Sequence, residues 1–274
     1  LLVCGKRPDG FHNLRTIMAK IDWFDKLTFE HSNMNGIELV CDGPQWAPTG
    51  PDNLVYKAVS KICDLTGTKP QVKVTLTKNI PAGSGLGSAS SDAAAALLAY
   101  NKFAGLKLTS ETLQQLASQL GSDVPFFLGP PQALCEGRGE KITGFSKNFN
   151  FSALLILPNI NTSTKRVYEN YCHRANLFEA LNSKFSTFLE QNKLDLVIEM
   201  CANMLEDSCF CLHPEIYKLK LKIEHLGIKP LMLSGSGSTL FHILPNRRKE
   251  VLSEYLALLE KINCAGVIVS NNNW

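Results

Sequence analysis

Hydrophobic and polar positions change their period along the chain, and this period predicts where strands and helices lie. Residues 71–77 alternate, with Val72, Val74 and Leu76 on one side, which predicts a strand with one buried face. The alanine-rich run 93–103 predicts a helix. The leucine spacing of three and four in residues 108–116 predicts a second helix directly after it.

The same patterns recur through the rest of the chain. Strands are expected at 1–4, 15–21, 26–30, 153–157 and 266–269, in a hairpin over 133–142, and on both sides of a glycine turn in 231–241. Helices are expected from residue 54 and at 161–168, 177–189, 194–205, 214–226 and 247–262. Sheets with helices on one side predict an α+β fold, with a seam between two lobes near residues 148–152.

Composition narrows the class of protein. The 274 residues suffice for one large or two modest domains, and 45% hydrophobic with 19% charged residues is ordinary for a globular protein. No apolar run is long enough for a membrane helix, and no signal peptide is expected. A net charge of +3 is too small to indicate nucleic-acid binding, although it does not oppose an anionic small substrate.

The cysteines favour a reducing compartment. There are 9 of them, without any C-x-x-C pair, and most lie in apolar segments. This pattern is typical of buried thiols and predicts a cytoplasmic protein rather than a disulfide scaffold. Cys209 and Cys211 are too closely spaced for a structural zinc pair, so no metal cage is expected.

A glycine-rich loop is the most informative stretch. It leads into the helix expected at 93–103 and reads Pro81-Ala82-Gly83-Ser84-Gly85-Leu86-Gly87-Ser88-Ala89-Ser90-Ser91-Asp92. Glycines allow close approach to the backbone, and the helix start offers unpaired N–H groups, so this place attracts phosphate. A Walker loop would need a lysine after the last glycine, and a dinucleotide fingerprint would need a third glycine at position 88. Position 88 is a serine, so neither pattern fits.

The loop instead resembles the P-x-G-x-G-L-G-S-[SA]-S segment of the GHMP small-molecule kinases, which wraps the ATP phosphates without a Walker lysine. The alternative is a glycine turn that only connects a strand to a helix. The resemblance implies a two-lobed α+β fold. Residues 1–150 would form the ATP-binding lobe, with a left-handed β-α-β-type (ribosomal protein S5 domain 2-like) sheet and helices. Residues 151–274 would form a C-terminal α+β sandwich lobe.

A second motif, G-[KR]-R-x-D-G-[YF]-H, is matched by residues 5–12. Alone it is typical of a hairpin connection. Within the GHMP family it resembles the branch that phosphorylates the 2-hydroxyl of 4-diphosphocytidyl-2-C-methyl-D-erythritol, in the non-mevalonate isoprenoid pathway. The resemblance implies that Phe11 and Tyr168 stack on the cytosine, that His12 pairs with the pyrimidine edge, and that Thr164 contacts the substrate phosphate. Tyr168 could also be a half-buried helix residue.

Two segments are expected on the nucleotide side. Asp52 or Asn53 would cap the helix that follows, and the resemblance of D-N-L to the family places Asn53 and Leu54 beside the adenine. Lys78 precedes Pro81 by three residues, so its ammonium could reach a nucleotide phosphate. It could equally be a solvated strand end.

Asp123 is the expected catalytic residue. It lies in Gly121-Ser122-Asp123-Val124-Pro125, where it could cap a short helix with an early proline. The segment resembles the family pattern G-[AS]-D-V-P-[FV]-F, which supplies the catalytic aspartate, and this implies that Asp123 accepts the proton of the substrate hydroxyl. Gly235 and Gly237 match a third motif, [LM]-[ST]-G-[ST]-G, whose turn approaches the phosphates.

One departure from the family weakens the assignment of activity. The strand P-A-K-[IL]-N-L, whose lysine lies beside the catalytic aspartate, is not in this sequence. Either the chain lacks an N-terminal segment or the protein is a weakened kinase. ATP and Mg²⁺ are the implied cofactors, with Ser88, Ser90 or Ser91 near the metal. We expect a monomer or weak homodimer with no nucleic-acid or membrane partner. The alternatives are a homoserine- or mevalonate-type kinase and a catalytically weak nucleotide-binding relative.

Overall fold

The chain divides into two compact units that do not follow its order. The computed structural model describes residues 1–146, 149–191, 193, 200, 202–245 and 249–272. Unit 1 comprises Leu1–Asp22, Gly83–Leu86 and Pro131–Trp274, and unit 2 comprises Trp23–Ala82 and Gly87–Pro130. The glycine-rich loop of residues 81–92, called the phosphate loop below, therefore begins in unit 2, contributes four residues to unit 1 and returns to unit 2.

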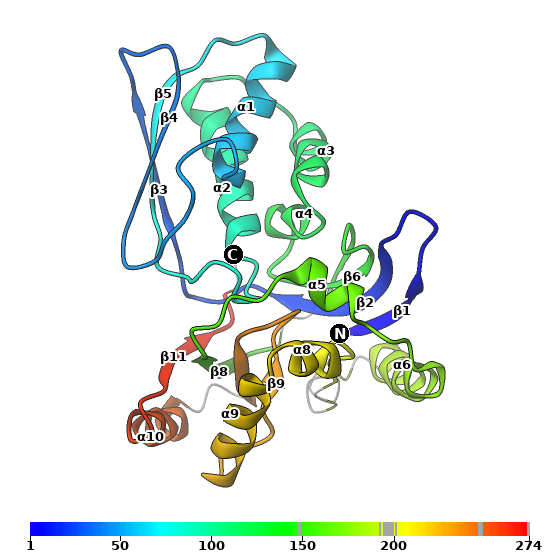
Figure 1. Ribbon diagram of the computed structural model, residues 1–274. Coiled ribbons are helices and arrows are strands. Elements are labelled where there is room, and N and C mark those ends of the chain that lie inside the picture. The colour runs from blue at the N-terminus through cyan, green and yellow to red at the C-terminus, as the bar shows by residue number, and fades with distance from the viewer. Residues whose placement is uncertain (147–148, 192, 194–199, 201, 246–248, 273–274) are drawn as a thin grey trace. The chain divides into compact units, whose positions relative to one another are not determined.

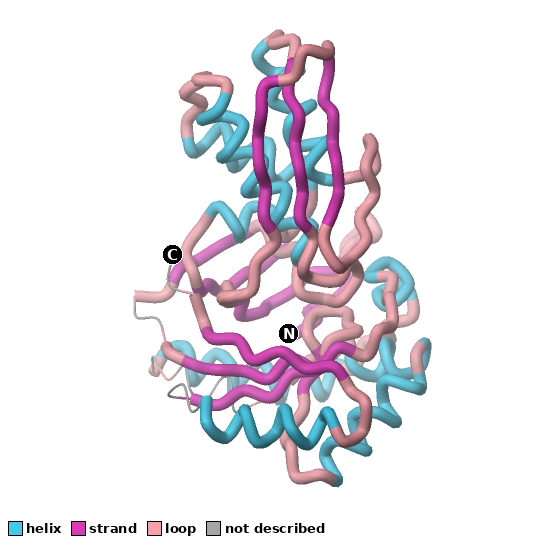
Figure 2. The backbone as a smooth tube through the Cα atoms, turned by 90° about the vertical axis from the view of Figure 1, so that its left-hand side faces the viewer, coloured by secondary structure: helices cyan, strands magenta, loops and turns pink. Residues whose placement is uncertain are grey.

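Unit 2 is a three-stranded sheet with helices on one face (Figure 1). The strand order is β3-β5-β4, where β5 (Gln71–Thr77) runs antiparallel to β3 (Lys26–His31) and parallel to β4 (Gly36–Asp42). Helix α1 (Leu54–Thr66) connects the parallel pair. In Figure 2 the strands stand in front of the helices, so the helices cover only one face of the sheet. Sheets with antiparallel strands commonly leave their second face to solvent.

The core of unit 2 forms where the sheet meets its helices. It contains Val72, Val74 and Leu76, the three residues whose alternation predicted the strand. Packed on it are α1, α2 (Ser88–Phe103), α3 (Ser110–Leu120) and α4 (Val124–Leu128). Alanines of α2, such as Ala93 and Ala96, are fully buried. Their small side chains let α2 approach α1 closely.

Unit 1 contains two four-stranded sheets. The first has the order β1-β2-β6-β7, built from β1 (Leu2–Lys6), β2 (His12–Ala19), β6 (Gln132–Gly137) and β7 (Lys141–Gly144). The second has the order β11-β8-β10-β9, built from β11 (Ala265–Ser270), β8 (Phe151–Leu157), β10 (Leu240–Pro245) and β9 (Met232–Leu233). Both contribute to one hydrophobic core, in which Leu2 and Val3 share a cluster with Leu154 and Ile156.

Helices complete the core of unit 1. They are α5 (Thr164–Glu169), α6 (Ala175–Glu190), α8 (Glu206–Leu212), α9 (Pro214–His225) and α10 (Lys249–Glu260). Ser163 caps α5 by accepting a hydrogen bond from the Arg166 N–H group, at 3.4 Å. In α9 the buried Ile216 and Ile223 face the core at helical spacing.

Most predicted elements are confirmed, with instructive exceptions. Helix α2 begins at Ser88, five residues before the alanine run, so the end of the predicted loop is helical. Strand β4 and helix α8 were not predicted. The helix expected at 194–205 lies largely outside the described residues, as does residue 148 of the expected seam.

Three further findings concern the described part of the chain. The α+β fold class is confirmed, while the handedness of the β4–α1–β5 crossover stays a prediction. None of the described helices is both long and apolar enough to span a bilayer. The cysteines among the described residues are free thiols. In the same part of the chain, no group of three or more His, Cys, Asp or Glu side chains is placed to hold a metal ion.

Candidate functional site

The phosphate loop presents an open helix end in unit 2. Gly87, in the left-handed conformation (φ 69°), occupies the N-cap position of α2 and offers no side chain to cap it. The first N–H groups of a helix have no partner within the helix, and the helix dipole places partial positive charge there. A β-carbon on Gly87 would lie 3.1 Å from the Phe127 ring, so α4 packs closely against this end.

In unit 1 the loop is held by its carbonyl groups. The Gly83 oxygen accepts a hydrogen bond from the Thr162 N–H (3.3 Å), and the Ser84 oxygen accepts one from the Thr239 N–H (3.0 Å). The Ser234 hydroxyl donates to the Gly85 oxygen (2.8 Å). Each trans peptide directs its N–H opposite to its C=O. The N–H groups of residues 84, 85 and 86 therefore each point away from the group that binds the carbonyl of the same peptide.

The third motif is the surface that anchors the loop. Gly235 and Gly237 have φ of 55° and 90°, and the turn between them closes with a Gly237 N–H to Ser234 O bond of 2.8 Å. Asn203 holds this turn from outside the motif, because its amide donates to the carbonyl oxygens of Leu233 and Gly235, both at 2.8 Å.

We expect Asn203→Ala to lower the free energy of unfolding by about 2 kcal/mol, because two carbonyl groups lose their donor. Urea denaturation measures the change. Asn176→Ala, an exposed asparagine in α6, is the matched control and should have little effect. Equal midpoints for the two variants would show that Asn203 does not hold the turn.

Asp123 occupies the N-cap position of α4, yet its side chain makes no capping hydrogen bond. The simple capping interpretation of this residue is therefore wrong. Within the described residues, the ion pairs of unit 2 do not include Asp123. Asp123 as a whole residue is exposed, but the protein atoms around its carboxyl desolvate it and raise its pKa above the ordinary value.

Lys78 is not a solvated strand end. Its side chain is 2% exposed and forms ion pairs with Asp25 and Asp92, and it donates a hydrogen bond to the Ser88 hydroxyl at 3.0 Å. Asp25 lies outside the sequence motifs, and no role was expected for Asp92. Whether Lys78 also contacts a nucleotide stays a prediction.

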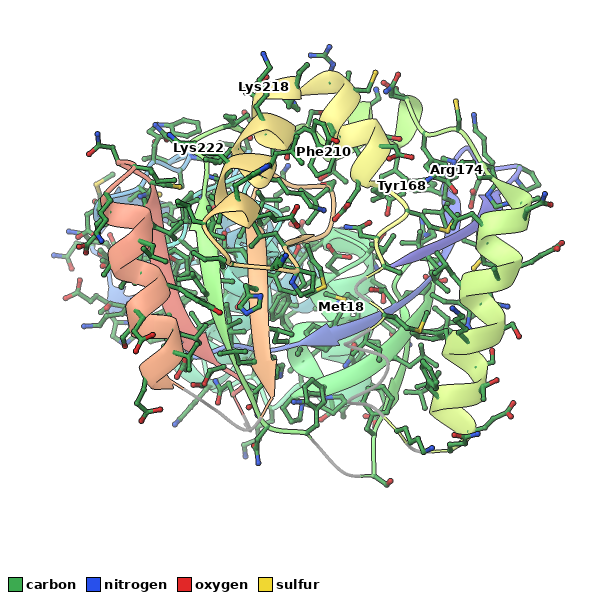
Figure 3. The ribbon with its side chains drawn as sticks, turned by 90° about the horizontal axis from the view of Figure 1, so that it is seen from below. Met18, Tyr168, Arg174, Phe210, Lys218 and Lys222 are labelled. Carbon is green, nitrogen blue, oxygen red and sulfur yellow. The ribbon has the colours of Figure 1, made fainter. Side chains whose placement is uncertain are left out.

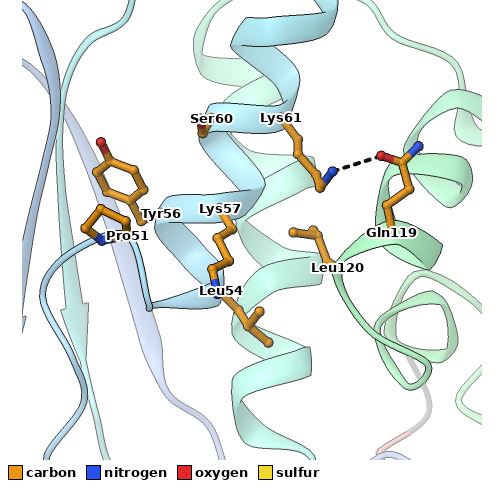
Figure 4. Close-up of a pocket in the computed structure, with 8 residues that line it drawn as sticks. All are labelled: Pro51, Leu54, Tyr56, Lys57, Ser60, Lys61, Gln119 and Leu120. Carbon is orange, nitrogen blue, oxygen red and sulfur yellow. Dashed lines mark hydrogen bonds between the residues drawn. The ribbon is translucent and has the colours of Figure 1, made fainter.

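Asn53 caps α1, as predicted. Its side-chain oxygen accepts the Val55 N–H at 2.8 Å, and its amide donates to the Pro48 oxygen at 2.7 Å. Leu54 lines a shallow cavity of about 340 Å³ between α1 and the end of α3 (Figure 4). Lys61 crosses this cavity to donate to the Gln119 side chain at 2.9 Å. The adenine-side roles of Asn53 and Leu54 stay predictions.

Aromatic residues gather near the second motif in unit 1. The His12 ring stacks on Tyr168, with centroids 5.4 Å apart, and meets Tyr171 edge-on at 5.7 Å. Figure 3 draws the side chains of Tyr168, in α5, and of Arg174, the residue directly before α6. Two of the three residues expected at a cytidine site are thus in contact.

Phe11, the third of these residues, is 50% exposed and carries the Arg138 guanidinium 4.9 Å from its ring centre. Arg138 lies at the bend between β6 and β7. A cation over an aromatic face is attracted to it, so Arg138 holds this ring in place.

Thr164 contacts the glycine turn of the third motif in unit 1. Its hydroxyl lies 2.8 Å from that of Ser236, inside the glycine turn. The residues predicted for nucleotide and substrate thus fall into two sets. Unit 1 brings together Gly83–Leu86, the Gly235–Gly237 turn and Thr164, and it also holds His12 beside Tyr168. Unit 2 holds Asn53, Leu54, Lys78, the start of α2 and Asp123.

These features define a class of protein that binds phosphate through a glycine loop without a Walker lysine. The chain belongs to the GHMP kinases: the model of the GHMP kinase N-terminal domain matches residues 53–129, and that of the C-terminal domain matches residues 178–261. The predicted division near residue 150 lies between these two matches, and its position stays a prediction.

Individual relatives narrow the comparison. The chain is 38% identical to the 4-diphosphocytidyl-2-C-methyl-D-erythritol kinase of Chloroherpeton thalassium, over 91% of this chain and 87% of that protein. A crystal structure of 4-(cytidine 5'-diphospho)-2C-methyl-D-erythritol kinase aligns with a TM-score of 0.74 at 28% identity, covering 100% of this chain and 95% of the other. Homoserine kinase from Cytophaga hutchinsonii aligns with a TM-score of 0.73 at 18% identity, over 96% and 88% of the two chains, which shows the shared fold alone.

Proposed function

We propose that the protein transfers the γ-phosphate of ATP to the 2-hydroxyl of 4-diphosphocytidyl-2-C-methyl-D-erythritol, a step that supplies isoprenoid precursors. The observation that carries this proposal is the anchoring of the loop through the carbonyl oxygens of Gly83, Ser84 and Gly85. With these carbonyl groups bound, the N–H groups of residues 84–86 would be available to an anion. The sequence identity to 4-diphosphocytidyl-2-C-methyl-D-erythritol kinases supports the choice of acceptor substrate.

The loop and the start of α2 fit the polyphosphate of ATP. Backbone N–H groups of residues 84–86 and of the first turn of α2 would neutralise charge on the phosphates, and the missing cap at Gly87 leaves room for them. Mg²⁺, when bound with ATP, shields phosphate charge and prefers oxygen ligands. The hydroxyls of Ser90 and Ser91, in the first turn of α2, are the oxygen groups we assign to its neighbourhood.

Asp123 accepts the proton of the attacking hydroxyl in this proposal. Phosphoryl transfer passes through a loose transition state, so the protein mainly positions the two substrates and stabilises charge. A carboxylate without a capping bond is free to accept a proton. Phe11, His12 and Tyr168 would hold the cytosine, with Thr164 near the diphosphate. A reducing, cytoplasmic setting agrees with the free thiols of the described cysteines.

A substrate panel tests the proposal. ADP release by the full-length protein is measured with cytidine-diphosphate methylerythritol, homoserine and mevalonate as acceptors. We expect the first to have the highest kcat/KM by a wide margin. Preference for either other alcohol would make the protein a different GHMP kinase. ATP binding without turnover on any acceptor would make it a nucleotide-binding relative.

Phe11→Ala tests the cytidine end. Loss of a stacking ring is worth about 1–3 kcal/mol, so we expect KM for the cytidine substrate to rise about 5-fold to 160-fold while KM for ATP stays near the parent value. Steady-state kinetics with each substrate varied in turn gives both constants. Trp46→Ala, which removes an aromatic ring that is 77% exposed, is the control. An unchanged KM for the cytidine substrate would remove Phe11 from its site.

A further inference from the structure

Unit 2 buries a charged cluster that the proposed reaction does not use directly. The side chains of Lys78, Asp25 and Asp92 are 2%, 3% and 8% exposed. Burying charge is costly unless each group is paired and hydrogen-bonded. The cluster lies where β5 ends and α2 begins, which are the two ends of the phosphate loop.

All three N–H groups of the Lys78 ammonium donate hydrogen bonds within this cluster. An ammonium has only three N–H donors. Its nitrogen donates to Asp25, to the Ser88 hydroxyl at 3.0 Å and to the Asp92 carboxylate at 2.9 Å. Ser88 and Asp92 lie in the first turns of α2. Lys78 therefore ties the end of β5 to the start of that helix.

Asp25 completes the connection. One of its oxygens receives Lys78, and the other accepts the backbone N–H groups of Asn79 (2.6 Å) and Ile80 (2.9 Å). These two residues directly precede Pro81, the first residue of the phosphate loop. A single carboxylate thus holds the residues before the loop and, through Lys78, the helix after it.

The charges in the cluster do not balance, since two carboxylates face one ammonium. Desolvation raises the pKa of Asp92 to about 7, and the charge of Asp25 adds to the rise while Lys78 opposes it. Replacing such a cluster with apolar residues is often neutral or stabilising. Its presence here therefore points to a requirement for geometry rather than for stability alone.

We infer that Asp25 is a positioning residue for the ATP phosphates, which it serves through the backbone of residues 79–80 and through Lys78. The inference rests on the proposed function. It assigns Lys78 the role of orienting the start of α2, with no N–H group left for a direct bond to phosphate.

Binding measurements on Asp25→Asn test the inference. Asparagine keeps the size of the side chain but weakens its hold on Lys78, and the first turn of α2 loses its fixed position. Isothermal titration with ATP and with adenosine separates the phosphate site from the base site. We expect Kd for ATP to rise at least about ten-fold, while Kd for adenosine stays within about two-fold of the parent.

Asp64→Asn, an exposed aspartate in α1, is the matched control and should bind both ligands like the parent. Equal ATP affinity in Asp25→Asn and the parent would overturn the inference, as would a parallel loss of ATP and adenosine binding. A parent protein that binds no ATP would instead refute the proposed function.

Hydrogen exchange on the parent protein decides the case where Asp25→Asn does not fold. If Asp25 holds the entry to the loop in advance, the amides of Asn79 and Ile80 exchange slowly without nucleotide and remain slow with ATP. Rapid exchange of both amides that slows only when ATP is added would overturn the inference.

Discussion

Asp123→Asn is expected to lower kcat by about 100-fold to 10,000-fold, the usual contribution of a general base, while ATP binding is retained. The amide has the shape of the carboxyl but cannot accept the substrate proton. The side chain makes no capping bond, so its replacement should not disturb α4. Single-turnover phosphorylation and ATP titration measure the two quantities separately.

Asp64→Asn serves as the control here too, because it removes the same charge from an exposed position. A rate for Asp123→Asn within a few-fold of the parent would exclude Asp123 as the base. Loss of ATP binding in this variant would instead mean that the carboxylate supports the nucleotide site.

The pH profile of the parent gives a further check on Asp123. A base acts only when deprotonated, and desolvation raises the pKa of this carboxyl above its ordinary 3.8. The acidic limb of kcat/KM should therefore lie at higher pH than that of an ordinary aspartate, with activity lost as pH falls through the raised value.

Gly85→Ala is expected to have the second large effect. A β-carbon at this position would lie 2.3 Å from the Ser234 carbonyl oxygen and 2.6 Å from that of Gly237, in a backbone with φ of 78°. Strain and overpacking together should lower the free energy of unfolding by about 3 kcal/mol. They should also displace the loop, so that affinity for ATP falls.

Gly227→Ala separates the clash from the backbone strain. Gly227 also belongs to unit 1 and has φ of 93°, but nothing lies within 4 Å of a β-carbon built there. We expect it to lose about 1–2 kcal/mol from strain alone and to bind ATP normally. If the two variants lost the same stability and both bound ATP, close packing of the loop on the third motif would not be required.

Helix-capping residues and hydrophobic alternation in the sequence predicted much of the fold. Asn53 and Ser163 stand at helix starts and cap them, and the alternation in 71–77 marks β5 with its correct ends. The start of α2 was missed because Ser88 and its neighbours suit a loop as well as the first turn of a helix. Strand β4 was missed because its alternation is weak and both its ends carry turn residues.

Residues that support the site were harder to find than those that form it. Asp25 lies 53 residues from Lys78, and Asn203 lies 30 residues from Leu233. Neither occurs in a motif, and each is a common surface residue type. Only the pairing of β3 with β5 brings Asp25 to the end of β5. Such long-range contacts leave no local pattern in the chain.

The position of the transferred phosphate tests the central claim most directly. The full-length protein is incubated with ATP and 4-diphosphocytidyl-2-C-methyl-D-erythritol, and the products are examined by phosphorus NMR. We expect a new phosphate monoester on the 2-hydroxyl, formed with one ADP for each ester. ADP and free phosphate without an ester, or an ester at another hydroxyl, would contradict it.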